Sequence, residues 1–442
     1  MKRITLLLSG IVALLGIVQE ASALPAFARQ TGMPCTACHQ QHFPVLNSFG
    51  QAFKASGYTI MGAQTPVEDE HLSIPPVLNA AILFKGRYQK TDGTGTGIND
   101  GTGTTTNDGQ WQFGDEFSVF FGGRVAENAG FLFEGNVGGT AATGNTTNTS
   151  ALVAGIKLPF MYDVKDAKVG LIPFSTDTLG VAYGFELAST GAVRNIRWAE
   201  NRNDISAQQY VGTGNSAASG VALVAKNEMG YVNYSRWSPN HLPGSNGGNT
   251  PSTGYKSNYL RVAVSPTLNN WEILTGIQLW NGTSEVLGTG TTGVVDSALK
   301  KTQAQALDLQ AFGKAGENDL AIYVTYAKAN ASKAGAVANL FNSGPYDRKA
   351  FTLGADYSVI PHALHVGAAY RSADDGGSTT SPNGKDNSIT VMAVYDVDQN
   401  VALHINHSMH SGSSYDAGGV NDATVAPNSG KNLTTLLLEM AW

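Results

Sequence analysis

The chain has 442 residues, a formal net charge of −6 at pH 7 and only 14% charged residues. This length allows one large domain or two to three domains of roughly 150 residues each. The 52 glycines, with many small polar residues, suit strands and polar loops better than helices, so we expect one large all-β domain. No basic cluster stands out, which argues against nucleic acid as a partner.

The first residues have the pattern of a secretory signal. Lys2 and Arg3 give the positive start, residues 4–18 are apolar, and small residues end at Ala23. We therefore predict a signal peptide over residues 1–23 and an exported mature protein. No later stretch approaches the ~18 consecutive apolar residues that a membrane-spanning helix needs.

Residues 24–75 form a distinct first segment without regular alternation of apolar and polar residues. The pattern predicts a short helix over residues 47–58 in an otherwise irregular segment. Phe49 and Phe53 would share one face of this helix, and Gly57 supplies the stop. A segment of this size can hardly bury a core alone, so it needs a cofactor or a neighbouring surface.

The two cysteines, Cys35 and Cys38, are separated by two residues and followed at once by His39. This is the C-x-x-C-H pattern of haem attachment, in which both thiols add to the haem vinyl groups and the histidine is the proximal iron ligand. A disulfide, a redox C-x-x-C pair and half of a zinc site are the alternatives. Zinc would need more ligands nearby, and thioredoxin-like chemistry would need a βαβ context. We therefore predict one covalent haem c.

From residue 76 to the C-terminus the pattern changes to segments of alternating hydrophobicity separated by turn-rich stretches, which is typical of a transmembrane β-barrel. The last segment shows the alternation best. One side would carry Leu436, Leu438, Met440 and Trp442, and the other Thr435, Glu439 and Ala441, with Leu437 as the one exception. The polar side would face the lumen, because lipid can satisfy no exposed polar group.

Connections alternate between short and long along the barrel region. Short turns are expected near 126–129, 160–164, 225–228, 265–270, 313–317, 357–362 and 396–400, and long polar links near 93–109, 139–149, 174–216, 237–256, 282–302, 329–347, 372–387 and 409–431. These seven turns and eight links join sixteen antiparallel strands, with short periplasmic turns and longer external loops. The longest link would either fold into the lumen or add two strands. A soluble β-sandwich or propeller is the alternative fold.

A second group of histidines lies near an external loop. On a strand, His404 and His410 would face the lumen and His407 the lipid, so the three would not meet at one metal ion. No Ser/His/Asp set, phosphate loop or carboxylate pair stands out, and hydrolytic chemistry has no support.

The sequence resembles the fused outer-membrane monohaem cytochrome–porins, whose best-studied members are iron oxidases of iron-oxidising bacteria. The resemblance is carried by Leu24-Pro-Ala-Phe-Ala-Arg-Gln-Thr-Gly-Met-Pro-Cys35-Thr-Ala-Cys38-His39, Phe43-Pro44, Phe49-Gly50, Phe53-Lys54 and Gly57-Tyr58-Thr59. It covers less than a tenth of the chain, and only the haem-binding positions carry over.

The resemblance implies a cytochrome segment (24–75) seated in or at the mouth of an outer-membrane porin (76–442). Such a protein would act as an Fe(II) oxidase, moving electrons from extracellular Fe(II) to a periplasmic c-type cytochrome or another periplasmic carrier. Two alternatives remain: an electron conduit with another donor or direction, and a diffusion porin with a haem-bearing plug.

The distal iron ligand has four sequence candidates. His42 and Met33 lie too near His39 in sequence to pass round the macrocycle edge, whereas Met61 and His71 can reach the opposite face. Of these two we prefer Met61, because a thioether raises the reduction potential, as oxidation of Fe(II) would need.

Overall fold

The structure is a computed structural model, and it describes residues 25–41, 44–70, 72–93, 108–138, 153–193, 202–241, 254–289, 295–378, 382–416 and 430–442. The predicted signal peptide (1–23) and two candidate ligands, His42 and His71, lie outside the described residues.

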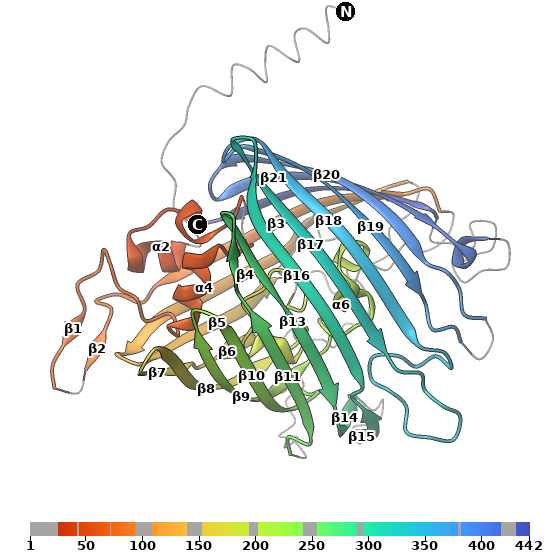
Figure 1. The fold of residues 1–442 in the computed structure, drawn as a ribbon, viewed down its shortest axis with the longest axis horizontal. Coiled ribbons are helices and arrows are strands. Elements are labelled where there is room, and N and C mark those ends of the chain that lie inside the picture. The colour runs from red at the N-terminus through yellow and green to blue at the C-terminus, as the bar shows by residue number, and fades with distance from the viewer. Residues whose placement is uncertain are drawn as a thin grey trace, which may run out of the picture.

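One closed antiparallel barrel dominates the fold (Figure 1). Its strands are β3 (Ala80–Thr91), β4 (Gln110–Ala126), β5 (Ala129–Gly138), β6 (Val153–Lys157), β7 (Phe160–Val164), β8 (Ala167–Thr176), β9 (Ala218–Asn227), β10 (Gly230–Ser238), β11 (Ser257–Val264), β12 (Thr267–Leu268), β13 (Trp271–Asn281), β16 (Ala304–Ala315), β17 (Asn318–Ala329), β18 (Arg348–Ile360), β19 (Leu364–Asp374), β20 (Asn387–Asp398), β21 (Val401–Ser411) and β22 (Asn432–Ala441). The last strand pairs with the first, Leu438 opposite Gly86, which closes the barrel.

The strand number of sixteen is confirmed for the described part of the chain. Both β6 and β7 pair with β5 and with β8, so they are two parts of one strand. Likewise β11 and β12 both pair with β13 and form one strand. Two further hairpins stand outside the barrel sheet, β1 (Val67–Glu68) with β2 (Ser73–Ile74), and β14 (Thr283–Thr289) with β15 (Val295–Lys301).

One expected turn is wrong. Residues 160–164, predicted to be a turn, continue the strand as β7, and the chain turns at the next two residues instead. Lys165 has a positive φ of 54°, as a tight turn requires. The interruption of the strand falls at Leu158–Pro159, where proline has no N–H to give to a neighbouring strand.

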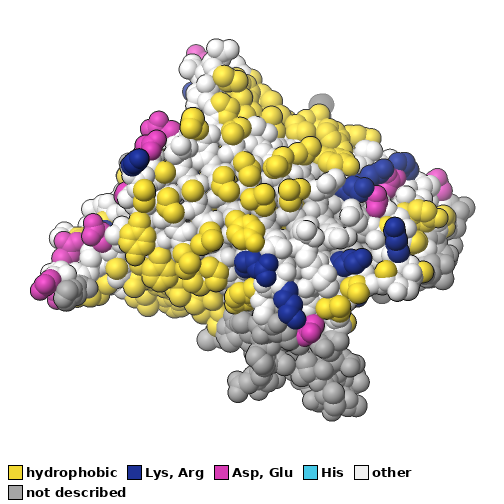
Figure 2. Space-filling model, turned by 60° about the horizontal axis from the view of Figure 1, so that its bottom comes forward, with side chains coloured by type: hydrophobic (Ala, Val, Ile, Leu, Met, Phe, Trp, Pro, Cys, Tyr) yellow, Lys and Arg dark blue, Asp and Glu magenta, His cyan; other side chains and the backbone are white. Residues whose placement is uncertain are grey.

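Side chains alternate between the two faces of the wall as the sequence predicts. Along β3, Lys85, Arg87 and Gln89 are buried on the lumen side. Large apolar side chains such as Leu436 and Ile405 point outward and are exposed. Figure 2 shows one outer face, where hydrophobic side chains form a broad band and charged side chains lie toward its ends. Such a band suits contact with lipid.

The long link after β8 folds into the lumen. It contains η1 (Val181–Tyr183), α5 (Arg202–Ile205) and α6 (Ala207–Tyr210), and its described residues from Val181 to Val193 are buried. The described residues of this link form no strand, so the two-extra-strand alternative is wrong for them. We call residues 177–217 the inserted loop.

The N-terminal segment carries α2 (Pro25–Thr31), α3 (Cys35–Cys38) and α4 (Ser48–Ala55), close to the C-terminus in Figure 1. The helix predicted over residues 47–58 is confirmed as α4, in somewhat shorter form. No helix among the described residues is both long and apolar enough to cross a membrane.

Candidate functional site

The C-x-x-C-H motif forms a single helical turn. In α3 the His39 N–H donates to Cys35 O at 2.9 Å, the spacing of an α-helix. His39 is the extended C-cap residue just after this turn, and Cys35 and His39 line the same cavity. The motif therefore presents a thiol and an imidazole together.

A second helix is packed directly against this turn. The N-cap of α4 is Asn47, whose Oδ1 accepts from Gly50 N–H at 3.0 Å and whose Nδ2 donates to Ala37 O at 3.1 Å. Gly50 approaches so closely that a Cβ there would lie 2.1 Å from Cys38 O. The small residue in the Phe49-Gly50 pair thus permits α4 to support the motif.

Three aromatic rings form the small core of the segment. Phe27 stacks on Tyr58 with 5.0 Å between ring centroids and meets the edge of Phe53 at 5.0 Å. These rings come from α2, α4 and the turn after it, so they hold the three pieces together. Gln30 Nε2 donates to Tyr58 O at 2.7 Å within the segment, and Gln30 Oε1 accepts from Arg124 N–H of β4 at 3.2 Å, which anchors the segment on the barrel.

The segment crosses the lumen from one wall to another. On the β20–β21 side, Cys35 N–H donates to Gln399 Oε1 at 3.0 Å and Cys35 Sγ–H donates to Gln399 O at 3.3 Å. Toward the β17–β18 side, Gln41 Nε2 donates to Asp319 O at 3.1 Å and Asp356 O at 3.0 Å. The motif is therefore held inside the barrel, at the end that carries the short turns.

A cavity lies between the motif and the wall formed by β20, β21 and β22. It is lined by Cys35, His39, Asp396, Gln399, Asn400, Val401, Ala402, His404, Glu439 and Ala441. Part of this space is open to solvent. The position of the cavity beside Cys35 and His39 fits a group attached to the motif.

The ring of His39 is held by a hydrogen bond to the backbone. His39 Nδ1 lies 3.3 Å from Val45 O, and since a carbonyl only accepts, Nδ1 is the donor. Histidines that bind metals usually give their other ring N–H to a carbonyl or carboxylate in this way. This hydrogen bond would leave Nε2 as the nitrogen that binds iron.

The cysteines lack the electrostatics of a redox pair. Burial raises the pKa of Cys35 to about 12, and the nearby Asp396 adds to this effect. Burial also raises the pKa of Cys38. Redox C-x-x-C pairs instead have a lowered thiol pKa. Both thiols are free rather than joined as a disulfide.

The donor set around the motif does not suit zinc. Within the part of the chain that the structure describes, no three His, Cys, Asp or Glu side chains are grouped so that they could hold a metal ion. Among the described residues, the two cysteines form no disulfide and no zinc-type donor group surrounds the motif, and its single turn is compatible with haem attachment.

Met61, the distal ligand preferred from sequence, is half-buried and does not line the cavity. It follows α4 on the side where Gly62 N–H donates to Gln30 O at 3.2 Å. Met33 is also half-buried and absent from the lining. The structure therefore does not bring either methionine together with Cys35 and His39 at this cavity.

The three histidines of β21 alternate as expected. His404 and His410 are buried on the lumen side, while His407 is half-buried and its Nδ1 lies 2.9 Å from Thr434 Oγ1. They do not share one site. His404 lines the cavity beside His39, and His410 belongs to a different cluster.

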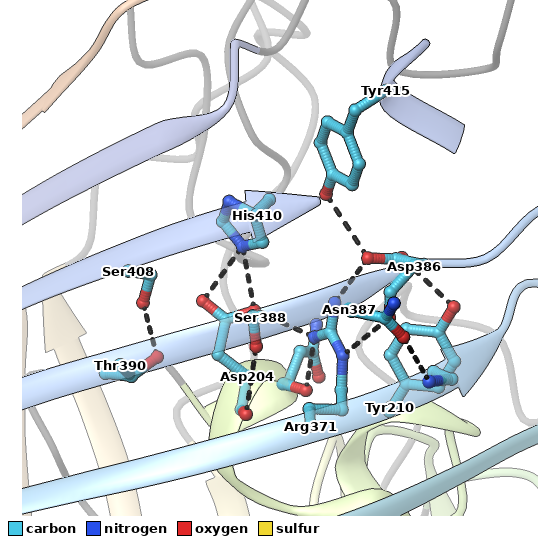
Figure 3. Close-up of polar contacts among 12 residues, drawn as sticks. Asp204, Tyr210, Arg371, Asp386, Asn387, Ser388, Thr390, Ser408, His410 and Tyr415 are labelled. Carbon is cyan, nitrogen blue, oxygen red and sulfur yellow. Dashed lines mark hydrogen bonds and ion pairs between the residues drawn. The ribbon is translucent and has the colours of Figure 1, made fainter. Parts of the chain in front are cut away.

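That second cluster fastens the inserted loop to the wall (Figure 3). Asp204 of α5 accepts from Arg371 Nη1 at 2.8 Å and contacts His410 Nε2 at 3.0 Å. Arg371 also pairs with Asp386, which in turn accepts from the Tyr210 hydroxyl of α6 at 3.0 Å. Hydrogen bonds and ion pairs of charged and hydroxyl groups thus hold the inserted loop against β19, β20 and β21.

The amides that position the motif were missed by sequence reasoning. Gln399 lies 364 positions from Cys35 in the chain, and Gln41 meets carbonyls more than 270 positions away. Only the turn signal near 396–400 pointed to this part of the chain. It placed a turn there but gave no reason to pair Gln399 with the motif.

No protein-family model matches the chain, and no curated protein matches it. Several solved structures do. The outer-membrane channel DcaP of Acinetobacter baumannii has a TM-score of 0.50 and 10% identity over 83% of this chain and 97% of that one. OmpT of Vibrio cholerae has a TM-score of 0.45 and 9% identity over 86% and 100%. OpdK of Pseudomonas aeruginosa has a TM-score of 0.43 and 9% identity over 82% and 98%.

At these identities the similarity shows the fold alone. The chain has the porin-like barrel fold of outer-membrane proteins, and its outer apolar band agrees with that fold.

Proposed function

We propose that this protein is an outer-membrane electron-transfer cytochrome–porin with one covalent haem c, and that it oxidises extracellular Fe(II). The observation that carries the proposal is the C-x-x-C-H turn held inside the barrel, beside a cavity that its Cys35 and His39 line together with His404 of the wall. Neither a soluble carrier nor an empty channel requires this arrangement.

The bilayer separates an extracellular donor from the periplasm, so electron transfer between them needs a protein that crosses it. Its hydrocarbon core is ~30 Å thick, and no soluble donor bridges it. When bound, the haem would supply a one-electron redox centre within the barrel. The segment lies at the short-turn end, which faces the periplasm in barrels of this kind. A periplasmic c-type cytochrome, or another periplasmic carrier, would therefore meet the centre directly.

The chain's own residues have distinct tasks in this proposal. Cys35 and Cys38 would form thioethers, and His39 would bind iron through Nε2 while Nδ1 stays on Val45 O. The cavity wall and the inserted loop would limit access of bulk water. Burial and hydrogen bonding of this sort are among the factors that set a haem potential.

A centre recessed at the periplasmic mouth favours a dissolved donor over a solid one. A small aqueous ion would be able to pass the partly filled lumen from the loop side, whereas a mineral surface or an electrode would stop at the external loops. This distinction supports Fe(II) over the alternative donors. Aqueous Fe(II) should accordingly reduce the protein faster than Fe(II) held in a bulky chelate.

The first test is the purified protein in detergent. The alkaline pyridine haemochrome should report one covalent haem c per chain, and aqueous Fe(II) should then reduce that haem promptly. A colourless mature protein would remove the cofactor, and a haem protein that Fe(II) fails to reduce at every pH tested would remove the donor. A stronger response to another reductant would reassign the donor or the direction.

Conductance in planar lipid separates the proposal from a diffusion porin. The inserted loop fills part of the lumen, so we expect small conductance together with a redox-active haem. A wide open channel with a redox-silent haem would instead identify the segment as a plug.

A further inference from the structure

His404 lies on β21, and its side chain is directed into the lumen with only 3% of its surface exposed. It lines the same cavity as Cys35 and His39. We propose that His404 is the second axial ligand of the haem iron, an inference that rests on the haem c of the proposed function and not on Fe(II) as the donor.

The cavity lining limits the choice of ligand. Haem iron in proteins is bound axially by histidine, methionine, a cysteine thiolate or tyrosine. The lining holds no methionine or tyrosine, and its cysteine, Cys35, belongs to the attachment motif. Once His39 is assigned to the proximal side, His404 is the one remaining lining residue of these types.

The two histidines come from independent elements, which solves a problem of reach. A ligand close to His39 in sequence cannot pass round the macrocycle to the other face. His404 is carried by the barrel wall, while His39 is carried by a segment that contacts that wall through Cys35 and Gln399. Two rigid elements can therefore offer one nitrogen each to a group between them.

The direct cross-strand neighbours of His404 are apolar, while Asp396 and Glu439 line the same cavity. Its cross-strand partners are Val394 on β20 and Leu437 on β22, and both are buried on the lumen side. Leu437 is the residue that breaks the alternation of the last strand, and its position beside His404 gives that break a reason.

The carboxylates of the cavity already have partners on the wall. Asp396 Oδ2 lies 2.9 Å from His365 Nε2, and Glu439 Oε2 lies 3.8 Å from Lys85 Nζ. Asp396 thus has a histidine partner, and Glu439 shares Lys85 with Glu116. Neither carboxylate belongs to the usual axial ligands of haem, so they do not compete with His404.

A pair of histidine ligands has a measurable consequence. Relative to a His/Met pair, two imidazoles give the haem a lower reduction potential, because the thioether favours the ferrous state. The assignment of His404 therefore predicts a potential below that of a Met61-ligated protein, and the two assignments can be separated without any assay of Fe(II) oxidation.

The experiment compares the wild type with four full-length variants, H404A, H404M, H407A and M61L. His407 is the matched control, because it lies on the same strand and faces the other side of the wall. Haem content by pyridine haemochrome is measured first and barrel folding by electrophoretic heat-modifiability second. Ligation is then read from ferric EPR, the near-infrared charge-transfer bands and the midpoint potential.

We expect the wild type to show a low-spin signal with two nitrogen ligands and no methionine charge-transfer band. H404A should lose this signal and gain carbon monoxide binding, and added imidazole should restore the low-spin form. H404M should show the methionine band and a raised potential. H407A and M61L should match the wild type.

A methionine band in the wild type, or its loss in M61L, would overturn the assignment of His404 in favour of Met61. A low-spin, unshifted spectrum in folded H404A would overturn it as well. If H404A does not fold, the wild-type bands and H404M decide alone. Absence of haem from the wild type would instead be a failure of the proposed function, which the haemochrome detects before ligation is examined.

Discussion

At the scale of single residues, the close packing of two backbone segments, rather than charge, holds the cysteine motif in place. Gly50 lets α4 lie against Cys38 O, and Asn47 joins the two helices through its side chain. The rings of Phe27, Phe53 and Tyr58 close the other side. Small and aromatic residues at these positions therefore have a structural reason that spacing alone does not reveal.

Gly50→Ala should loosen this support. Its Cβ would lie 2.1 Å from a backbone oxygen, which cannot be relieved by a rotamer change, so the two helices must separate. Overpacking of this kind costs ~1–3 kcal/mol. We expect faster proteolysis of the N-terminal segment and a lower yield of attached haem.

Ser48→Ala is the matched control on the same helix, because Ser48 is exposed. It should leave proteolysis and haem yield unchanged. Equal behaviour of the two variants would show that the close approach of α4 to Cys38 is unimportant.

At the scale of elements, the inserted loop is fixed to the wall by buried ion pairs at two levels. Deep in the lumen, Arg261 of β11 lies 3.2 Å from Glu186 of the loop and 2.7 Å from Asp308 of β16. Nearer the loop end, Arg371 and His410 hold Asp204. The loop is thus a built part of the lumen.

Glu186→Gln should weaken the deeper attachment. Arg261 keeps its two hydrogen bonds to Asp308, so its charge stays compensated while the contact with Glu186 is reduced. Loss of one buried charged partner of this kind should lower the free energy of unfolding by about 1–3 kcal/mol, measured by urea titration in detergent.

The comparison variant is Asp163→Asn, which removes the surface pair between Asp163 and Lys168. Exposed pairs contribute ~0–1 kcal/mol, so this variant should unfold almost like the wild type. Equal losses in both variants would contradict the assigned role of Glu186.

Asp204→Asn should increase conductance at pH 7, because it removes the charge that Arg371 and His410 grip. Burial by itself would raise the pKa of Asp204, but the His410 ring and the Arg371 guanidinium outweigh it and hold the pKa well below the usual range. The stabilisation is therefore full above the unfolded value of ~3.9 and is lost as pH falls through the lower folded value.

Single-channel recordings between pH 7 and the acid range test this assignment. The wild type should keep its small conductance down to about pH 4, which is the ordinary pKa of a carboxyl group, and its conductance should rise only below that pH. A wild type that opens at mildly acidic pH would show that another group controls the loop.

At the scale of the whole molecule, the barrel fold could be predicted from the sequence because the wall has lipid on one side and a polar lumen on the other. That arrangement imposes a period of two, and the short and long connections fixed the number of strands at sixteen. The turn predicted at 160–164 was misplaced because the strand is interrupted at Pro159, between β6 and β7.

The site could be predicted from the sequence only where its residues are neighbours along the chain. Cys35, Cys38 and His39 form a local pattern, but Gln399 and His404 reach the same place from the other end of the chain. No period or spacing relates residues that meet across a lumen. The exception at Leu437 was the one visible trace of the site on the last strand.

The outer apolar band gives a prediction for the molecule in its membrane. Ile405 is 47% exposed and lies near the middle of β21 on the outer side. Ile405→Lys should destabilise the barrel in lipid vesicles by ~2–4 kcal/mol, as expected for a cation near the bilayer midplane. Ile405→Leu should be almost neutral, and a tolerated lysine would place this strand outside the hydrocarbon region.

The bond between Cys35 and Gln399 carries a consequence for how the protein is made. Those two residues belong to nearly opposite ends of the chain, and the first and last strands join beside them. Once that seam has formed, Cys35 is buried against Gln399 in the turn between β20 and β21, and its thiol is less accessible than in the open chain. Under the proposed function, the porphyrin should therefore be attached before the barrel closes, and the wall is then assembled around a cofactor already in place.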